Sequence, residues 1–240
     1  PDSVMVVAAG NTVEDGAIAF EMGTALSDRL IHIHLKADPQ DWLETYAGPK
    51  GLAPAVTAFL RARPDLLDTT EDTLRRGDVI ACTPRSWERA SNILNAIPDR
   101  KARQAMIAGT LGDAVASEFS VVADEIEATV HINHLLEASE KERFVVFPNN
   151  LYGLNAVVFG LIGAATPHTL PAVIETMEQI RRIADHSDDP AFAGLPLDEL
   201  SVYGFEMLLT KALKEGWQET FLQSPAYARY VAARRDLGLD

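Results

Sequence analysis

The stretch VMVVAAGN at residues 4–11 decides the predicted fold of this chain, together with the stretch IHIHL at residues 31–35. The first is a short apolar run, rich in β-branched residues and ended by Gly-Asn, which is typical of a strand buried on both faces of an α/β sheet. The second follows a predicted helix over residues 17–30 and indicates another buried strand. Together they predict the end of a parallel sheet.

Polar side chains stand at the ends of these two predicted strands. Asn11 follows the first strand, and Arg29 comes just before the second. Ligands of open α/β sheets gather outside the carboxyl ends of the strands, so an amide at position 11 can orient a water molecule or contact a phosphate. A guanidinium at position 29 can reach a neighbouring subunit. The pair therefore indicates half of a nucleotide site.

Three further motifs follow the predicted strands in order. They are DPQDW at residues 38–42, FLRARP at residues 59–64 and CTPRSWERAS at residues 82–91. With the AAGN sequence of residues 8–11, the series resembles the MoxR-like, dynein-related branch of the AAA+ ATPases, as far as about residue 119. The resemblance implies a sensor-one role for Asn11, an arginine-finger role for Arg29 and a nucleotide-binding sensor-two role for Arg85.

Other parts of such an ATPase are missing from the sequence. There is no G-x-x-x-x-G-K-[ST] phosphate loop and no apolar strand ending in an Asp-Glu pair that would hold Mg²⁺. Asp124-Glu125 comes nearest, but the residues before it continue a helical pattern. In the family these parts precede the sensor-one strand. We therefore expect the 240 residues to be the carboxy-terminal portion of a longer protein. That protein would bind ATP and Mg²⁺ mainly through residues outside this chain, and the portion alone would not hydrolyse ATP.

The family's strand order adds a second expectation. The strand that carries the phosphate loop lies between the sensor-one strand and the last strand, so residues 4–9 and 31–35 would not be neighbours. Each would leave an unpaired edge, and unpaired backbone groups are costly when buried and attract other strands when exposed. We expect missing residues to pair with these strands, or the portion to borrow partners by swapping or association.

Composition predicts a soluble, cytoplasmic globular chain. The 47% of hydrophobic and 23% of charged residues are ordinary values. The formal charge of −14 repels phosphate backbones, so we expect no nucleic-acid partner. The single cysteine, Cys82, excludes an internal disulfide and fits a reducing compartment. The longest apolar run, residues 151–165, is shorter than the roughly 20 residues of a spanning helix, which predicts a buried helix and no membrane.

The predicted fold class is mainly α with a partial α/β, in three parts. Residues 1–37 would form the end of the AAA+ α/β core, residues 38–128 a helical lid with Arg85, and residues 129–240 a helical carboxy-terminal extension. Helices are expected in the lid over residues 40–46, 52–63 and 84–96, with one long helix or a helix pair over 101–128. They are expected in the extension over residues 129–142, 150–165, 170–185, 197–215 and 225–237, with an extended link at 144–148. Thr83 and Thr169 are the expected caps of two of these helices.

Each candidate site residue also has a purely structural explanation. Asn11 is a turn former after glycine. Arg29 would be favoured near a helix C-terminus, where cations are stabilised. Arg85 could pair with Glu88 across one helical turn. The mechanism would need both arginines, because fixed positive groups must meet the charge that builds on the transferring phosphoryl oxygens.

The histidines and the cysteine suggest other sites, which we disfavour. His32 and His34 share one strand face, and His131 and His134 recur with Glu137 on one helix face. Neither group supplies the ligand number of a known metal site, so no metal ligand is assigned. Cys82 lacks the surroundings of an activated thiolate, and no G-x-S-x-G sequence occurs.

The resemblance implies a ring ATPase, which would most simply be hexameric, with Arg29 acting in trans on a neighbour's γ-phosphate. Members of this branch act as chaperones that mature or remodel partner complexes, often beside proteins with von Willebrand factor A domains. One alternative is a non-catalytic helical interaction module descended from such an ATPase. A second is a free-standing helical enzyme with a site that the motifs do not mark.

Overall fold

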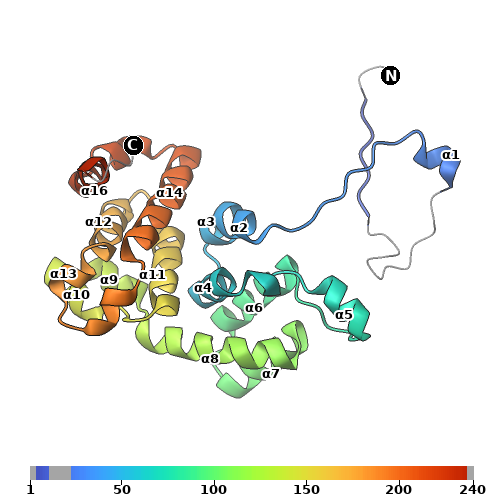
Figure 1. Cartoon of the computed structure of the whole chain (residues 1–240), viewed down its shortest axis with the longest axis horizontal. Helices are drawn as coiled ribbons and strands as arrows, with labels where there is room; N and C mark the ends of the chain where they lie inside the picture. The colour runs from blue at the N-terminus through green and yellow to red at the C-terminus, as the bar shows by residue number, and fades with distance from the viewer. Residues whose placement is uncertain (1–3, 11–22, 237–240) are drawn as a thin grey trace.

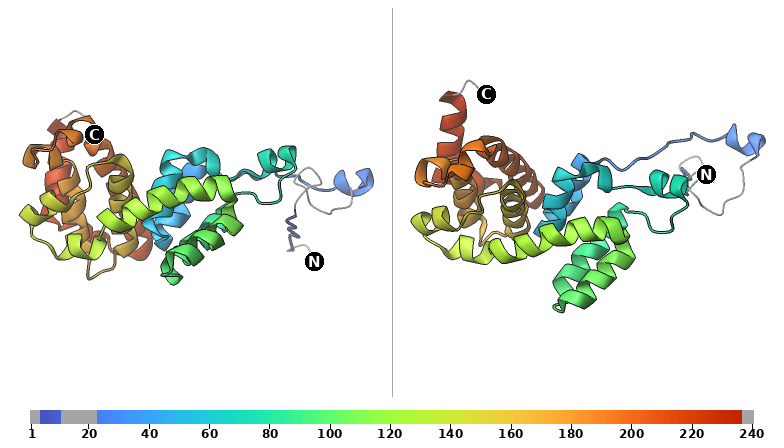
Figure 2. Two further views of the ribbon diagram at one scale, coloured as in Figure 1. Left: turned by 90° about the horizontal axis from the view of Figure 1, so that it is seen from below. Right: turned by 60° about the horizontal axis from the view of Figure 1, so that its bottom comes forward.

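The computed structural model describes residues 4–10 and 23–236 of the chain. From residue 39 onward the helices gather into one body, and residues 4–10 and 23–38 project from one end of it (Figure 1). Two further views show the same arrangement, with the carboxy-terminal helices at the opposite end (Figure 2). The chain is therefore mainly helical over the described residues.

The described helices are three to nineteen residues long. In sequence order they are α1 Thr24–Ser27, α2 Pro39–Asp41, α3 Gly48–Lys50, α4 Pro54–Ala62, α5 Thr70–Arg76, α6 Pro84–Ala96, α7 Arg100–Leu111, α8 Asp113–Thr129, α9 Ile132–Glu137, α10 Glu140–Val146, α11 Leu151–Ala164, α12 Leu170–Ile180, α13 Ile183–His186, α14 Leu197–Glu215, α15 Gln218–Leu222 and α16 Pro225–Asp236, with the π-helical turn η2 Trp42–Ala47 and the 3₁₀ turns η3 Pro64–Leu66 and η4 Pro190–Gly194.

The predicted sheet is not shown in the described part of the chain. Residues 4–10 and 31–35 adopt no regular structure there, and their apolar side chains face solvent: Val6 is 89% exposed and Ile31 92%. The physical reason is that a strand needs a neighbour to pair its backbone groups, and the described residues place none beside these two segments. Of the helix expected over residues 17–30, the short α1 is described, and residues 11–22 lie outside the described ranges.

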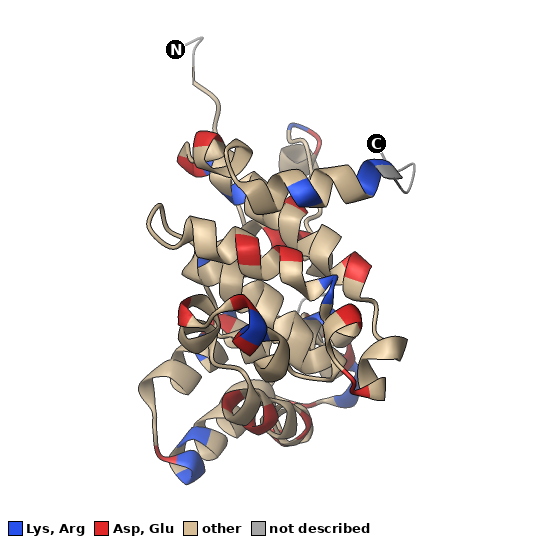
Figure 3. Ribbon diagram, turned by 90° about the vertical axis from the view of Figure 1, so that its left-hand side faces the viewer, with Lys and Arg blue, Asp and Glu red and all other residues tan. Residues whose placement is uncertain are grey.

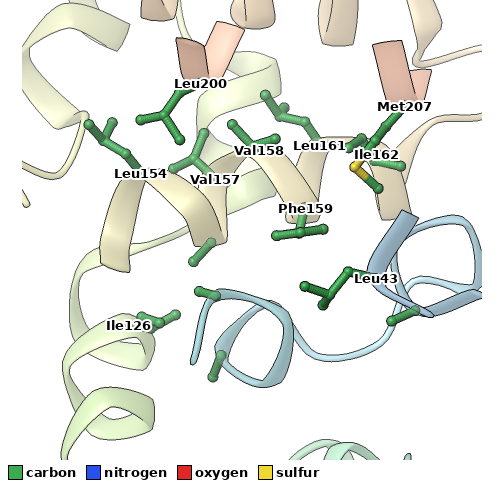
Figure 4. Close-up of a cluster of buried hydrophobic side chains, with 14 of the residues drawn as sticks. Leu43, Ile126, Leu154, Val157, Val158, Phe159, Leu161, Ile162, Leu200 and Met207 are labelled. Atoms are coloured by element: carbon green, nitrogen blue, oxygen red, sulfur yellow. The ribbon is translucent and has the colours of Figure 1, made fainter. Parts of the chain in front are cut away.

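Helix α11 lies at the centre of the body. Ten of its fourteen residues are buried, as expected for the longest apolar run of the chain. It packs against α4 on one side and against α12 and α14 on the other, with α8 crossing nearby. Figure 4 shows Val157 and Phe159 of this helix among side chains from η2, α8 and α14. The helices before and after residue 128 therefore share one hydrophobic core.

Small residues let neighbouring backbones approach α11. A Cβ atom on Gly163 would lie 3.0 Å from the Cα of Gly51, which itself has a φ of +71° and ends α3. Gly204 of α14 instead makes room for a side chain of α12, because a Cβ at this position would lie 2.3 Å from the Sδ of Met177. Both glycines thus mark contacts too close for a larger side chain.

Most lid helices are close to prediction, but α5 was not expected, and the helix expected over residues 40–46 is α2 followed by the π-helical turn η2. Helix α6 has the expected bounds, and α4 begins two residues later than expected because Pro54 occupies its first position. Residues 101–128, expected as one long helix or a helix pair, are the pair α7 and α8, which is divided at Gly112, a residue with a φ of +84°. Only a glycine adopts that backbone conformation without strain.

The extension departs from prediction at several places, among them the short helix α15, which was not expected. The helix expected over residues 129–142 is two helices, because Ser139 and Glu142 form a capping box that begins α10. The expected extended link at 144–148 is therefore helical as far as Val146. The Thr169 side chain does not cap α12, since its hydroxyl donates to the carbonyl oxygen of Ala164 at 2.7 Å, and α12 ends at Ile180.

The carboxy-terminal helices α14, α15 and α16 pack together through a group of aromatic rings. Phe205 of α14 stacks on Tyr230 of α16 with ring centres 4.0 Å apart, and Phe221 of α15 meets Tyr227 edge-on. Acidic and basic segments are interspersed over this end of the molecule (Figure 3). Among the described helices, none combines the length and the apolar character that crossing a bilayer requires.

Candidate functional site

The start of α6 carries Arg85, the predicted site residue of the lid. Thr83 is the N-cap of α6, and the hydroxyl of Thr83 accepts from the backbone N–H of Ser86 at 3.2 Å. The Ser86 hydroxyl in turn accepts from the Thr83 N–H at 2.7 Å. Pro84 fills the first helical position, where no N–H is needed. These bonds fix the direction in which α6 leaves the preceding loop.

Trp87 anchors this helix start to the core. The indole is fully buried, and its Nε1 donates to the carbonyl oxygen of Leu66 at 2.8 Å. Its ring meets Phe59 of α4 and Phe119 of α8, with ring centres 5.5 and 5.3 Å away. Because Trp87 and Arg85 are two positions apart on the helix, burial of the indole leaves Arg85 on the exposed side.

Arg85 is exposed and makes no ion pair or side-chain hydrogen bond with any described residue. The alternative pairing with Glu88 is not formed, because Glu88 accepts from Lys50 Nζ and from the Tyr46 hydroxyl. The Lys50 ammonium also holds the pKa of Glu88 below its usual value. The backbone of Arg85 thus has a fixed place in the first turn of α6, and its guanidinium is exposed without a polar partner among the described residues.

The loop that leads into Arg85 is tied at its base. The N–H of Thr69 donates to the carbonyl oxygen of Cys82 at 3.0 Å, and the N–H of Cys82 donates to the Thr69 hydroxyl at 2.9 Å. Between these residues α5 projects from the body (Figure 1). Cys82 itself is buried, and burial raises the pKa of its thiol to about 11, so the sulfur is not an activated nucleophile.

Of the other two predicted site residues, the one that the structure describes, Arg29, is not brought to Arg85. Arg29 is exposed, two residues after α1 ends, and α1 lies apart from α6 in every view (Figures 1 and 2). Its position after a helix end also agrees with the structural explanation, although α1 is only four residues long. Asn11 lies outside the described residues. The roles of Asn11 and Arg29 therefore stay predictions.

The two histidine pairs of the sequence lie in different parts of the structure. His32 is exposed, and its Nε2 lies 2.9 Å from the Ser27 hydroxyl. His131 and His134 line a groove with His186 of α13, whereas Glu137 does not line it. In the described part of the chain, no group of three His, Cys, Asp or Glu side chains is arranged to hold a metal ion.

The sequence pattern does not indicate this groove, because its lining comes from two segments that are far apart in the chain. The groove has a volume of about 750 Å³ and lies between the α9–α10 region and the loop after α13. Its polar rim includes Asp188 and Asp189, which follow His186 in the sequence. The nearest sequence signal was the spacing of His131 and His134, but nothing in the pattern paired them with residues so much later in the chain.

Comparison of the chain with protein-family models, curated proteins and solved structures finds no match.

Proposed function

We propose that this chain is the sensor, arginine-finger and lid portion of a MoxR-like AAA+ ATPase, with a helical carboxy-terminal extension. The complete enzyme binds ATP and Mg²⁺ between the subunits of a ring, which is most simply hexameric. ATP binding and hydrolysis in the ring then drive the remodelling or maturation of a partner complex. A partner with a von Willebrand factor A domain is one candidate for the client system.

The observation that carries the proposal is the support of the helix turn that carries Arg85. Arg85 is exposed and, like Arg76 and Arg89, has no carboxylate partner among the described residues. The capping box of Thr83 and Ser86 and the buried indole of Trp87 both support the helix turn that carries it. Such rigid support is what a group that senses phosphate charge requires.

The projecting segments add independent support. Residues 4–7 and 31–35 expose apolar side chains that would be expected inside a core, with Met5 86% and Leu35 89% exposed. Contiguous apolar side chains on a surface mark places where other chain segments bind. Pairing with the strands of a nucleotide-binding sheet would bury these side chains and satisfy their backbone groups. It would also place Asn11 and Arg29 at the edge of that sheet.

ATP turnover of the complete gene product, with any residues encoded before Pro1, tests the proposal. Replacing Arg29 by alanine should lower turnover by about 10³-fold or more, because an arginine finger stabilises charge on the transferring phosphoryl group. Arg85→Ala should lower turnover or weaken ATP binding. Lys141→Ala is the control, since Lys141 is exposed on α10 in the extension and should leave turnover unchanged.

Two results would reject the ring-ATPase proposal. One is a complete gene product that does not hydrolyse ATP although it is folded and assembled. The other is an Arg29→Ala variant with the turnover of the unaltered protein. Either result would leave the resemblance as a record of ancestry alone.

A non-catalytic interaction module is the second candidate function. The observation in its favour is the absence of a phosphate loop from all 240 residues of the sequence. The well-packed helical body and its lateral groove would suit assembly with another protein. Reading the codons upstream of Pro1 separates the two candidates, because a sequence without a phosphate loop there would favour the interaction module.

A further inference from the structure

The groove beside α9 and α10 combines an apolar floor with an acidic rim. Buried side chains form the floor, namely Leu135, Phe144, Phe147 and Phe192. Val145 stands at the edge of this floor and is 84% exposed. A volume of about 750 Å³ is in the range of ligand-binding clefts, and apolar lining with a few polar groups is their usual composition.

Contacts within the chain order this groove before any ligand binds. The Nδ2 of Asn149 donates to Asp189 at 2.8 Å, which links the entry of α11 to the loop after α13. The other Asp189 oxygen accepts from the N–H of Ala191 at 2.9 Å and begins η4. The ring of His186 stacks on Phe144, with ring centres 4.3 Å apart. The α10 side of the groove and the loop after α13 are therefore held in place by contacts within the chain.

The basic side chains in the groove lining are the imidazoles of His131, His134 and His186. Asp188 and Asp189 line the groove, and no Lys or Arg of the described residues does. Arg182 lies behind the floor, 5.7 Å from the centre of the Phe144 ring, and is paired with Glu140 and Glu178. Asp188 is exposed and has no ion pair or hydrogen bond with a described residue. The Asn149 amide also holds the pKa of Asp189 below its usual value, which keeps that carboxylate charged.

We propose that this groove binds a cationic segment of a partner protein that carries an apolar anchor residue. The anchor side chain would cover Val145 and rest on Phe147 and Phe192. Lysine or arginine residues beside it would pair with Asp188 and Asp189, and the imidazoles of the rim would exchange hydrogen bonds with its backbone. The inference does not depend on nucleotide chemistry, because neither Arg29 nor Arg85 lines the groove.

Charge complementarity selects this occupant over others. The two carboxylates of the rim disfavour nucleic acid and acidic peptides, whereas a purely apolar ligand would leave the Asp188 carboxylate beside its surface without a partner among the described residues. An apolar anchor within a ring of polar contacts is the arrangement that carries most of the energy in protein interfaces. The groove provides both elements within one volume.

Fluorescence anisotropy with a labelled heptapeptide, Gly-Lys-Leu-Lys-Phe-Lys-Gly, tests the proposal on the chain without nucleotide. Two control peptides replace either all lysines by glutamate or both Leu and Phe by serine. We expect binding of the first peptide and at least about tenfold weaker binding of both controls, since each loses one of the two elements. Because the assay contains no ATP, its failure would not bear on the ATPase proposal.

Matched variants locate the binding. Asp188→Asn and Val145→Ser should each weaken binding by about fivefold or more, because they remove the charge and the apolar edge. Asp113→Asn and Val121→Ser change an exposed carboxylate and an exposed valine on α8, outside the groove, and should leave it unchanged. All four side chains are exposed, so circular dichroism should show an unaltered fold. No peptide binding, equal binding of the glutamate peptide, or unchanged binding by Asp188→Asn and Val145→Ser would overturn the proposal.

Discussion

Lys211 of α14 donates a hydrogen bond from its Nζ to the carbonyl oxygen of Ile162 at 2.6 Å, in the last turn of α11. The lysine is only 9% exposed, and burial lowers the pKa of its ammonium group. The last carbonyl groups of a helix have no partner within the helix and favour a nearby cation. This bond therefore ties the central helix to the longest helix of the extension.

Lys211→Met should lower the free energy of unfolding by about 1–3 kcal/mol, because the carbonyl of Ile162 loses its charged donor and keeps only the backbone N–H of Ala165, at 3.3 Å, while most of the side-chain volume is kept. Urea denaturation followed by circular dichroism measures the change. Lys214→Met is the matched control, since Lys214 is exposed one turn later on the same helix and should change stability little. Equal stability of the two variants would show that the Lys211 bond contributes nothing.

Stability should fall above pH 9.0 through the thiol of Cys82. Burial raises the pKa of this thiol from its ordinary value of 9.0 to about 11 in the folded protein. Between these values the unfolded chain loses the proton first, so folding loses up to about 2–3 kcal/mol as the pH rises to about 11. Cys82→Ala should remove this dependence. The difference between the two proteins, measured by denaturation from about pH 8 upward, cancels other groups such as Tyr203, and a constant difference would refute the prediction.

Trp87 should be the most sensitive position near Arg85. Trp87→Ala should cost about 3–5 kcal/mol, because it empties the contact between α4, α6 and α8. Trp87→Phe keeps most of the ring and should cost less, mainly the indole hydrogen bond to Leu66. Thermal unfolding measures both. Similar stability of the alanine variant and the unaltered protein would mean that this contact does not anchor α6.

Two helical glycines should respond oppositely to alanine. Gly204→Ala should destabilise by about 1–3 kcal/mol, because its Cβ would lie 2.3 Å from the Sδ of the fully buried Met177. Gly109→Ala on α7 should stabilise by about 0.5–1 kcal/mol, since a Cβ there meets nothing within 4 Å and alanine favours the helix. The same sign for both changes in thermal unfolding would contradict the packing of α12 against α14.

Helix caps and apolar runs in the sequence predicted the helices that depend mainly on local interactions. The Thr83-Pro84 start fixed the first residue of α6, and the apolar run of residues 151–165 predicted the buried helix α11. The break before α10 was also readable, because Ser139 and Glu142 have the spacing of a capping box. Thr169 was misjudged because its hydroxyl donates to the carbonyl oxygen of Ala164, five residues earlier, and does not cap α12.

The candidate sites depended on contacts that no local pattern contains. The exposure of Arg85 follows from the burial of Trp87; the sequence predicts a core anchor at Trp87 but not the two helices, α4 and α8, that it contacts. The groove depends on His186 stacking over Phe144, a contact between residues far apart in the sequence. The predicted strands depended on neighbours that the described residues do not place beside them.

Residues 4–9 and 31–35 must pair with a nucleotide-binding sheet if the proposed function is right, and amide hydrogen exchange of these segments in the complete gene product measures that pairing most directly. If the segments are strands of such a sheet, their amides should exchange slowly there, and those near Arg29 should slow further with ATP and Mg²⁺. In this chain alone the same amides should exchange rapidly. Rapid exchange of both segments in the complete, ATP-bound protein would contradict the ring-ATPase proposal.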